Sequence, residues 1–462
     1  MPPLPIPKKT SLAIATLGAL LLLLEFTNLA RPFTVSEVFD FRPRDLPSVQ
    51  PLPPAPVVPH PAVAAKRPIL EANLIDPHDA LRPFYLALWR TELGAPGAIT
   101  RVLHYGDSPV TADSITADVR SLLQDHFGDA GHGFVLIAKP WAWYGHRGVD
   151  IRAKGWRIAA ATMPARAKDG FHGLGGVSFE GDAGASSTFE LAEDHARMEI
   201  HYLRQPSGGV LSVEAAGQKL GEIATDGPDK EPADQSFPLN PGARSIELSV
   251  KRGPLRLFGV TFERNTPGVI YNSLGLNGGQ VSAVAHYFDK AQWAKELAQQ
   301  HPNLVVINYG TNESGYADYI EHSYPGELRQ VIERVKAAVP QASVLIMSPM
   351  DRGQRDSNAQ ISTIPSLPRL VEIQRQTAEA MNCAFFNTFQ AMGGAGTMAR
   401  WYDSQPRLVS ADFTHPLPAG AHKVGALLDQ ALESGFRQFK TREQQQTARR
   451  KTVPHEINRG SR

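Results

Sequence analysis

Three short polar segments of this 462-residue sequence carry residue types that could together hydrolyse an ester. Gly106-Asp107-Ser108 offers a hydroxyl nucleophile, and Asp412-Phe413-Thr414-His415 offers a carboxylate and an imidazole three residues apart. That separation lets one loop present both side chains to a single point. The carboxylate then holds the imidazole Nδ1–H and leaves Nε2 free to take the serine proton. The third segment contains Asn312, whose amide could donate a hydrogen bond to a developing oxyanion.

Each segment alone has a common structural explanation. Gly-Asp-Ser is a frequent turn, and a Gly-x-Asn loop such as 310–312 is a turn signal. An Asp-x-x-His pair is often a helix cap or a surface pair. Their order along one chain, each after a run that predicts a strand, favours a catalytic constellation over three unrelated turns.

The elements around these segments predict an α/β domain. An apolar run at 101–105 precedes Ser108, and 116–127 follows it with helical spacing, which predicts strand, tight turn and helix. Open α/β sheets place their ligands at the carboxyl ends of such strands. Further strands are expected at 304–308, 344–347 and 384–386, and helices at 78–93, 281–299, 318–338, 367–381 and 418–438.

Residues 150–265 have a different pattern. Short β-prone runs, several of which alternate apolar and polar residues, are separated by turns rich in Gly and Pro, such as 206–209. This spacing predicts an all-β sandwich inserted into the α/β domain.

With a glycine segment at 271–279, these blocks resemble the SGNH (GDSL-type) hydrolases, in which four blocks supply Ser, Gly, Asn and His. The resemblance implies a three-layer α/β/α, flavodoxin-like fold. It implies catalysis by Ser108, Asp412 and His415 without a cofactor or metal. It also implies an oxyanion hole made by the N–H of Ser108, the N–H of Gly278 and the amide of Asn312, with Gly279 the second choice for the glycine.

A closer resemblance is to the peptidoglycan O-acetylesterases of Gram-negative envelopes. Residues 104–108, 127–134 and 267–278 look similar to theirs, and those enzymes carry a β-sandwich resembling a carbohydrate-binding module between the first two blocks. The resemblance implies a serine esterase that removes O-acetyl groups from a cell-envelope glycan, peptidoglycan being the expected polymer. One departure is Pro109, because the broad family has Leu and the closer relatives a polar residue after the serine.

Two other functions remain open. An O-acyltransferase would form the same acyl-enzyme and pass the acyl group to a sugar hydroxyl. A membrane-tethered glycan-binding protein would use the α/β domain only as a scaffold. The net charge of +1 gives no broad attraction for nucleic acid. The single cysteine, Cys383, excludes an intramolecular disulfide and a cysteine-rich zinc site.

Several further residues have two interpretations. The aromatic run 141–144 could form a wall for a sugar ring, but packing between domains is favoured. Asp107 is expected to cap the following helix or to fix the turn. His104, His132, His146 and His172 are expected to be structural, with their ring nitrogens hydrogen-bonded. Asp351, Arg352 and Arg355 follow a strand end, where the sequence does not decide whether they line the cleft.

The N-terminal segment predicts export. Lys8 and Lys9 precede the apolar run 12–24, so residues 1–30 are expected to be a membrane anchor or a signal, with an uncleaved inner-membrane anchor favoured and the remainder periplasmic. The predicted organisation then comprises a Pro-rich linker at 31–68, a hydrolase domain at 69–149 and 266–438, the inserted sandwich at 150–265 and a polar basic tail at 439–462. The tail is expected to fray from Arg437.

Overall fold

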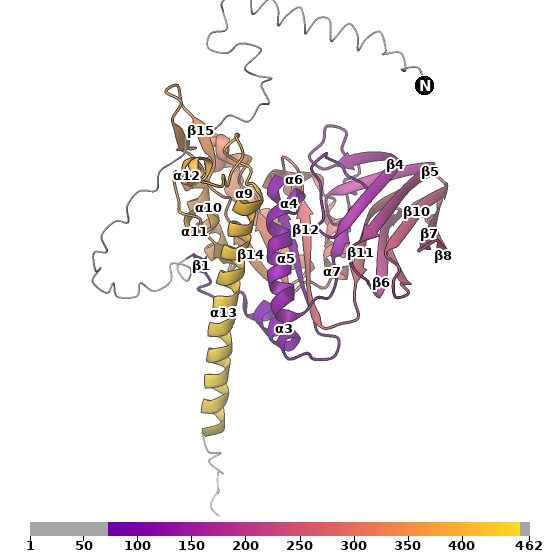
Figure 1. The fold of residues 1–462 in the computed structure, drawn as a ribbon, viewed down its shortest axis with the longest axis horizontal. Helices are drawn as coiled ribbons and strands as arrows, with labels where there is room; N and C mark the ends of the chain where they lie inside the picture. Colours follow the sequence, from indigo (N-terminus) through magenta and orange to yellow (C-terminus); the bar gives the residue numbers. More distant parts are fainter. Residues whose placement is uncertain (1–72, 453–462) are drawn as a thin grey trace, which may run out of the picture. The chain divides into compact units, whose positions relative to one another are not determined.

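The structure is a computed structural model that describes residues 73–452 (Figure 1). The predicted anchor at 1–30 and the linker at 31–68 lie outside these residues. Within 73–452, none of the helices combines the length and the apolar character that crossing a membrane would require.

A six-stranded sheet forms the centre of the α/β part. Its order is β1-β17-β14-β13-β2-β12, and every neighbouring pair is parallel except β1 with β17. The strands are β1 (Leu74–Ile75), β2 (Ile99–Gly106), β12 (Gly268–Gly275), β13 (Leu304–Asn308), β14 (Ser343–Met347) and β17 (Ala384–Phe386). The five parallel strands follow the spatial order 2-1-3-4-5, which is the flavodoxin-like doubly wound arrangement. The predicted fold class is confirmed.

Successive side chains of the buried strands belong alternately to two apolar clusters, so the core has two layers. In β13, Val305 and Ile307 belong to one apolar cluster, and Leu304 and Val306 belong to the other. Successive side chains of a strand point to opposite faces of a sheet, so this sheet must be covered on both sides. One cluster contains α3 (Arg82–Glu92), α5 (Ser114–Phe127) and α13 (Pro418–Thr452), and the other contains α7 (Lys290–Gln299), α9 (Tyr324–Ala338) and α10 (Leu367–Ala380).

Two predicted helices are each divided in the structure. The expected helix at 281–299 is α6 (Val281–Tyr287) followed by α7, because the Asp289 side chain accepts the N–H of Gln292 and starts a new helix. The expected helix at 318–338 is α8 (Ala317–His322) followed by α9, whose first turn contains Pro325. Proline has no N–H to continue the preceding helix but fits a first turn.

The second sheet is antiparallel throughout and confirms the predicted β insertion. Its order is β8-β7-β10-β5-β11-β6-β9, with β3 paired to β11 and β4 to β5. The strands are β3 (Gly133–Val135), β4 (Val149–Ala160), β5 (Val177–Leu191), β6 (Arg197–Arg204), β7 (Val210–Ala215), β8 (Gln218–Ala224), β9 (Glu231–Pro238), β10 (Ser245–Arg252) and β11 (Leu255–Glu263). Figure 1 shows this sheet beside the helices that cover the parallel sheet.

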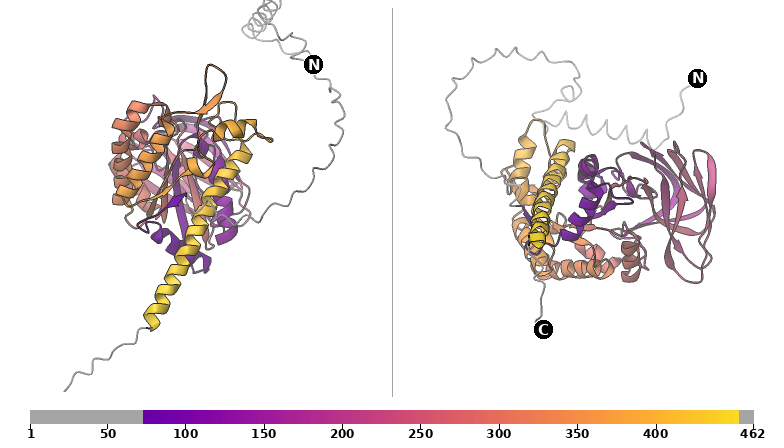
Figure 2. Two further views of the ribbon diagram at one scale, coloured as in Figure 1. Left: turned by 90° about the vertical axis from the view of Figure 1, so that its left-hand side faces the viewer. Right: turned by 90° about the horizontal axis from the view of Figure 1, so that it is seen from below.

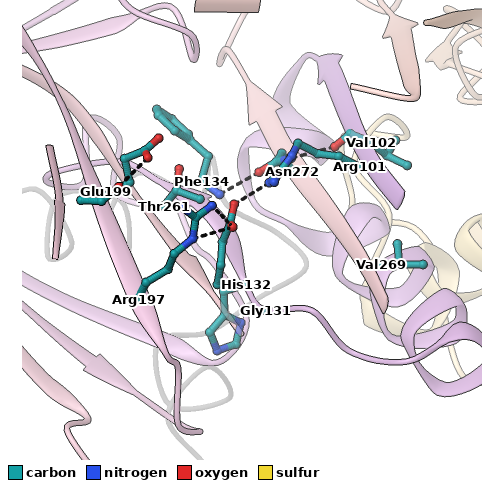
Figure 3. Close-up of polar contacts among 12 residues, drawn as sticks. Arg101, Val102, Gly131, His132, Phe134, Arg197, Glu199, Thr261, Val269 and Asn272 are labelled. Carbon is teal, nitrogen blue, oxygen red and sulfur yellow. Dashed lines mark hydrogen bonds and ion pairs between the residues drawn. The ribbon is translucent and has the colours of Figure 1, made fainter. Parts of the chain in front are cut away.

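The antiparallel sheet begins earlier than the predicted boundary at residue 150. Strand β3 pairs with β11 although the sequence analysis assigned it to the hydrolase part. Asn272 of β12 fixes this junction, because its Oδ1 accepts the N–H of Phe134 at 2.8 Å and its Nδ2 donates to the carbonyl of Val102 at 2.9 Å (Figure 3). A three-residue strand leaves little periodic pattern, so the sequence did not predict it.

The C-terminal prediction was wrong between Arg437 and Thr452. Helix α13 runs without a break to Thr452 and extends past α3 (Figures 1 and 2). Phe439 is buried against Tyr85 and Trp89, and Lys440 forms an ion pair with Glu92 at 2.6 Å. These partners lie some 350 positions earlier in the chain, so a local count of polar residues could not predict them.

Candidate active site

The turn between β2 and the short helix α4 (Ser108–Thr111) presents Ser108. A Cβ on Gly106 would lie 2.5 Å from Cγ2 of Val110 and 3.1 Å from the Asn308 carbonyl oxygen, so only glycine allows this close approach. Pro109 stands in the first turn of α4, where no intrahelical acceptor exists for its missing N–H. The departure from the family pattern is therefore compatible with the turn.

Ser108, His415 and Asp412 form a continuous hydrogen-bonded chain. Ser108 Oγ lies 2.8 Å from Nε2 of His415, and Nδ1 of His415 lies 2.6 Å from Oδ2 of Asp412. In the tautomer with a proton on Nδ1, the imidazole donates to the carboxylate and accepts the serine hydroxyl. The structure thus brings together the three predicted catalytic residues in the geometry of a nucleophile, a general base and an orienting acid.

Asp412 is held in its ionised form. Partial burial favours the neutral acid, but hydrogen bonds from Ser410, from the His415 ring and from the backbone N–H groups of Thr414 and His415 hold the pKa of Asp412 well below its usual range. An ionised Asp412 fixes the orientation of the ring and would stabilise the imidazolium that forms when His415 takes a proton.

The predicted oxyanion donors also meet beside Ser108. As the first residue of α4, Ser108 has no intrahelical acceptor for its N–H. Gly278 has a φ of +65° and lines the same cleft, and within 73–452 no acceptor takes its N–H, whereas the N–H of Gly279 donates to the carbonyl of Leu276 at 2.8 Å. The geometry thus favours Gly278 over Gly279. Nδ2 of Asn312 donates to the Gly279 carbonyl at 2.8 Å, which fixes the amide beside this turn.

The topology explains why these loops converge. Ser108 follows β2 and Asn312 follows β13, and these neighbouring strands pair in register up to Gly106 and Asn308. The two strands flank the position where the order of the doubly wound sheet reverses, which is where such sheets bind ligands. The third loop, 410–416, is closed by a backbone bond from Ser410 to the carbonyl of His415 at 2.9 Å.

A cleft of about 1120 Å³ surrounds the catalytic residues and is open to solvent. It exceeds the volume that a drug-sized ligand fills. Trp143 is 55% exposed and lines this cleft, and its Nε1–H donates to Oδ1 of Asn277 at 3.0 Å. Tyr144 is buried instead, and Trp141 packs against the core. Packing therefore accounts for Trp141 and Tyr144, whereas Trp143 forms an aromatic wall of the cleft.

Two buried carboxyl groups adjoin the site. Asp107 was expected to cap the following helix or to fix the turn, and the structure shows the second role: its side chain makes no capping bond, and its Oδ2 has no partner among the described residues. Its main-chain carbonyl instead fixes the turn by accepting the N–H of Thr111 at 2.9 Å. Burial raises the pKa of Asp107 to about 6, although hydrogen bonding from Thr311 and the charge of His415 act against this shift.

Glu313 was not singled out from the sequence, although it directly follows Asn312. It is fully buried, and its Oε1 accepts the N–H of Val281 at 2.8 Å. Burial raises the pKa of Glu313 to about 8, so the neutral acid prevails at pH 7. A neutral acid here leaves the nearby oxyanion donors without a competing negative charge.

The histidine prediction was partly wrong. His104, His146 and His172 are buried, but each keeps at least one ring nitrogen without a hydrogen-bond partner among the described residues, and so does His132. Burial lowers the pKa of His104 and of His172 to about 4, so both are neutral at pH 7. A neutral ring packs as an aromatic group, as His104 does against Tyr271, which explains how partly unpaired nitrogens are tolerated.

The three residues left undecided at the end of β14 have different positions. Asp351 is buried and accepts hydrogen bonds from Thr363 and from the N–H of Met398. Arg355 stacks over the ring of Phe413 at 5.1 Å. Arg352 lines the cleft.

Comparison with family models finds a match to part of the chain. Residues 241–423 match the GDSL-like lipase/acylhydrolase family, a range that contains Gly278, Asn312, Asp412 and His415 but not Ser108. Among curated proteins, none matches the sequence. The family match and the fold together confirm the predicted resemblance to SGNH hydrolases.

Among solved structures, a peptidoglycan O-acetylesterase resembles the chain over most of its length. The TM-score is 0.68 at 21% sequence identity, covering 79% of this chain and 99% of that protein, which shows a shared fold. A family two carbohydrate esterase from Clostridium thermocellum in complex with cellohexaose (10% identity, TM-score 0.27) covers 62% of this chain and 100% of its own. A salicylyl-acyltransferase from a tetracycline biosynthetic pathway has 11% sequence identity and a TM-score of 0.28, and the match covers 65% of this chain and 97% of that protein. Their low TM-scores indicate no more than distant likeness.

Proposed function

We propose that this chain, a hydrolase of the SGNH type, removes O-acetyl groups from a cell-envelope glycan and that the glycan is peptidoglycan. The observation that carries the proposal is the hydrogen-bonded chain from Ser108 through His415 to Asp412, which lines a cleft open to solvent. A polymer needs such a cleft, because both ends of the bound segment must leave it.

The proposed reaction uses the groups already aligned. Ser108 Oγ attacks the acetyl carbonyl while Nε2 of His415 takes its proton, and the oxyanion is bound by the N–H groups of Ser108 and Gly278 and the amide of Asn312. His415 then protonates the departing sugar oxygen. Water, activated by the same imidazole, hydrolyses the acetyl-enzyme and regenerates Ser108.

Substrate and location follow from separate observations. Trp143 offers an indole face on which the C–H face of a sugar ring can pack. The shared fold with a peptidoglycan O-acetylesterase supports the choice of polymer. The sequence of residues 1–30 supports a periplasmic domain held at the inner membrane, so that the cleft faces the cell wall.

The test measures acetate release from O-acetylated peptidoglycan by the full chain purified in detergent, beside Ser108→Ala. Ser249→Ala, in strand β10 of the insertion, is the matched control. Release by the parent and the control but not by Ser108→Ala supports the proposal. Transfer of acetyl groups from an activated ester to glycan, with no release to water, would establish a transferase instead. Glycan binding without either activity would establish a scaffold.

A further inference from the structure

Asp113, which follows the nucleophile turn, has an unusual backbone conformation. It is the N-cap residue of α5, and its φ of +51° lies in the left-handed region. Residues other than glycine rarely adopt this region, and they persist there only where the surrounding structure fixes them. An N-cap aspartate usually accepts a backbone N–H of its own helix, but Asp113 makes no such bond. Its carboxylate is buried, so its hydrogen bonds must lead to other partners.

Four hydrogen bonds from the described residues converge on this carboxylate. Oδ1 accepts the hydroxyl of Thr116 at 2.7 Å and Nη1–H of Arg120 at 3.1 Å. Oδ2 accepts Nη2–H of Arg120 at 2.6 Å and the main-chain N–H of Arg147 at 2.8 Å. Burial favours the neutral acid, but the charge of Arg120 holds the pKa of Asp113 well below its usual range. The N–H of Arg147 therefore donates to an ionised acceptor, and such bonds are about twice as strong as those between neutral groups.

The bond from Arg147 connects the hydrolase domain to the loop between β3 and β4. Residues 143–147 of this loop are called the wall segment, because Trp143 and its neighbours line the cleft. A second main-chain bond joins this segment to the nucleophile turn, from the N–H of Gly145 to the carbonyl of Thr111, but it is longer at 3.4 Å. The bond to the carboxylate is therefore the shorter and stronger of these two attachments.

We propose that Asp113 is a positioning residue that holds the wall segment against the nucleophile turn and thereby fixes the indole of Trp143 relative to Ser108. The inference rests on the proposed function, in which a sugar ring packs on Trp143 while its acetyl group reaches Ser108. A glycan must make both contacts at once, so a displaced wall segment weakens its binding. A small ester contacts only the catalytic groups, so its hydrolysis does not depend on the wall segment.

The turn at 146–149 allows this one bond to be removed. The N–H of Val149 donates to the carbonyl of His146 at 3.0 Å, and Gly148 has a φ of +87°, which is typical of a type II turn. Arg147 is the second residue of this turn, a position where proline is common. Arg147→Pro therefore retains the turn and removes the main-chain donor.

Arg147→Ala is the matched control. It removes the same side chain, including its ion pair with Asp118 at 2.6 Å, but keeps the main-chain N–H. The difference between the two variants therefore reports the bond to Asp113. A direct substitution is less informative, since Asp113→Asn would leave the buried charge of Arg120 unpaired and destabilise the fold.

The two variants of the full chain are compared on soluble O-acetylated glycan fragments and on a small chromogenic acetate ester. KM for the glycan should be about tenfold higher in Arg147→Pro than in Arg147→Ala, the usual effect of losing one bond to a charged group, while kcat should be equal. Both variants should hydrolyse the small ester at the same rate. In a Trp143→Ala background the difference in KM should vanish, because the bond then has no indole to position.

Equal KM values for the glycan in the two variants would overturn the inference. So would an equal loss on glycan and small ester in Arg147→Pro, because that result would make the bond a general support of the nucleophile turn. A difference that persists in the Trp143→Ala background would exclude Trp143 as the group that Asp113 positions.

Two measurements without turnover separate this inference from the proposed function. In calorimetry with Ser108→Ala, glycan binding should be about tenfold weaker when Arg147→Pro is added than when Arg147→Ala is added. Hydrogen exchange at the amide of Gly145 should be faster in Arg147→Pro than in Arg147→Ala. If the parent releases no acetate but both differences appear, the inference stands and the proposed function fails. Equal binding or unchanged exchange refutes the inference whatever the hydrolysis shows.

Discussion

The side-chain amide of Asn312 donates a hydrogen bond to the main-chain carbonyl of Gly279 over 2.8 Å. This bond connects the loop after β13 with the turn that follows β12, and each contributes one proposed oxyanion donor. An Asn amide has two N–H bonds, so one can hold the glycine turn while the other faces the substrate. The two donors therefore depend on each other for their position.

Asn312→Ala should accordingly lower kcat by about 10²- to 10³-fold, the usual effect of removing one oxyanion donor. The measurement is hydrolysis of a chromogenic acetate ester. Asn358→Ala, in the exposed turn between β15 (Gly353–Arg355) and β16 (Ile361–Thr363), serves as the control and should keep wild-type rates. Wild-type kcat in Asn312→Ala would remove Asn312 from the oxyanion hole.

Substitutions at the two adjacent glycines should separate activity from stability. A Cβ at Gly278 would meet no atom within 4 Å, so Gly278→Ala carries mainly the backbone cost of a φ of +65°, about 1 kcal/mol. A Cβ at Gly279 would lie 2.7 Å from the Leu276 carbonyl oxygen. Thermal melts should therefore show a larger loss in Gly279→Ala, whereas Gly278→Ala should mainly lose kcat. An unchanged kcat in Gly278→Ala would argue against its N–H as a donor.

Asp412→Asn should lower kcat by about 10²- to 10⁴-fold with little change in KM, because an amide can hold the His415 ring in the wrong tautomer. The loss of kcat in the double variant Ser108→Ala/Asp412→Asn should be smaller than the product of the two single losses, since the residues act as one unit. Chromogenic ester kinetics of the single and double variants test this. Fully multiplicative effects would contradict a shared proton-transfer chain.

Trp143→Ala should raise KM for O-acetylated glycan about tenfold and leave the kinetics of a small chromogenic ester nearly unchanged, because only the polymer reaches the indole. Trp143→Phe keeps an aromatic face but loses the N–H to Asn277, so an intermediate KM is expected. Equal losses on polymer and small ester would indicate instead that Trp143 maintains the shape of the cleft.

Glu313 should make the folded state less stable as pH rises. Burial raises its folded pKa to about 8, above the usual 4.5, so the folded state binds more protons than the unfolded state between these values. Its stabilising contribution is complete below about pH 4.5 and declines until about pH 8. Urea unfolding of Glu313→Gln should show a smaller loss of stability between pH 5 and pH 9 than the parent.

The control for this pH profile is Glu333→Gln on the exposed side of α9, which should follow the parent. If Glu313→Gln and the parent lose equal stability over the same range, then Glu313 is not the group whose proton uptake differs between the folded and unfolded states.

The sequence by itself determined the relationships that act over a few residues. Short apolar runs predicted β2 and β13, and the ends of these strands predicted where Ser108 and Asn312 lie. The three-residue separation of Asp412 and His415 indicated that one loop carries both. These features depend on local backbone periodicity, which a linear pattern records. The family resemblance added the choice of Gly278, which the structure favours because no acceptor within residues 73–452 takes its N–H.

Tertiary structure alone decided what depends on segments distant in the chain. Ser108 and His415 are 307 residues apart, and only the packed sheet brings them to 2.8 Å. Burial raises the pKa values of Asp107 and Glu313, and contact with α3 extends α13. Solvent exposure and charge environment are set by all neighbours in space, so the order of residues along the chain does not specify them.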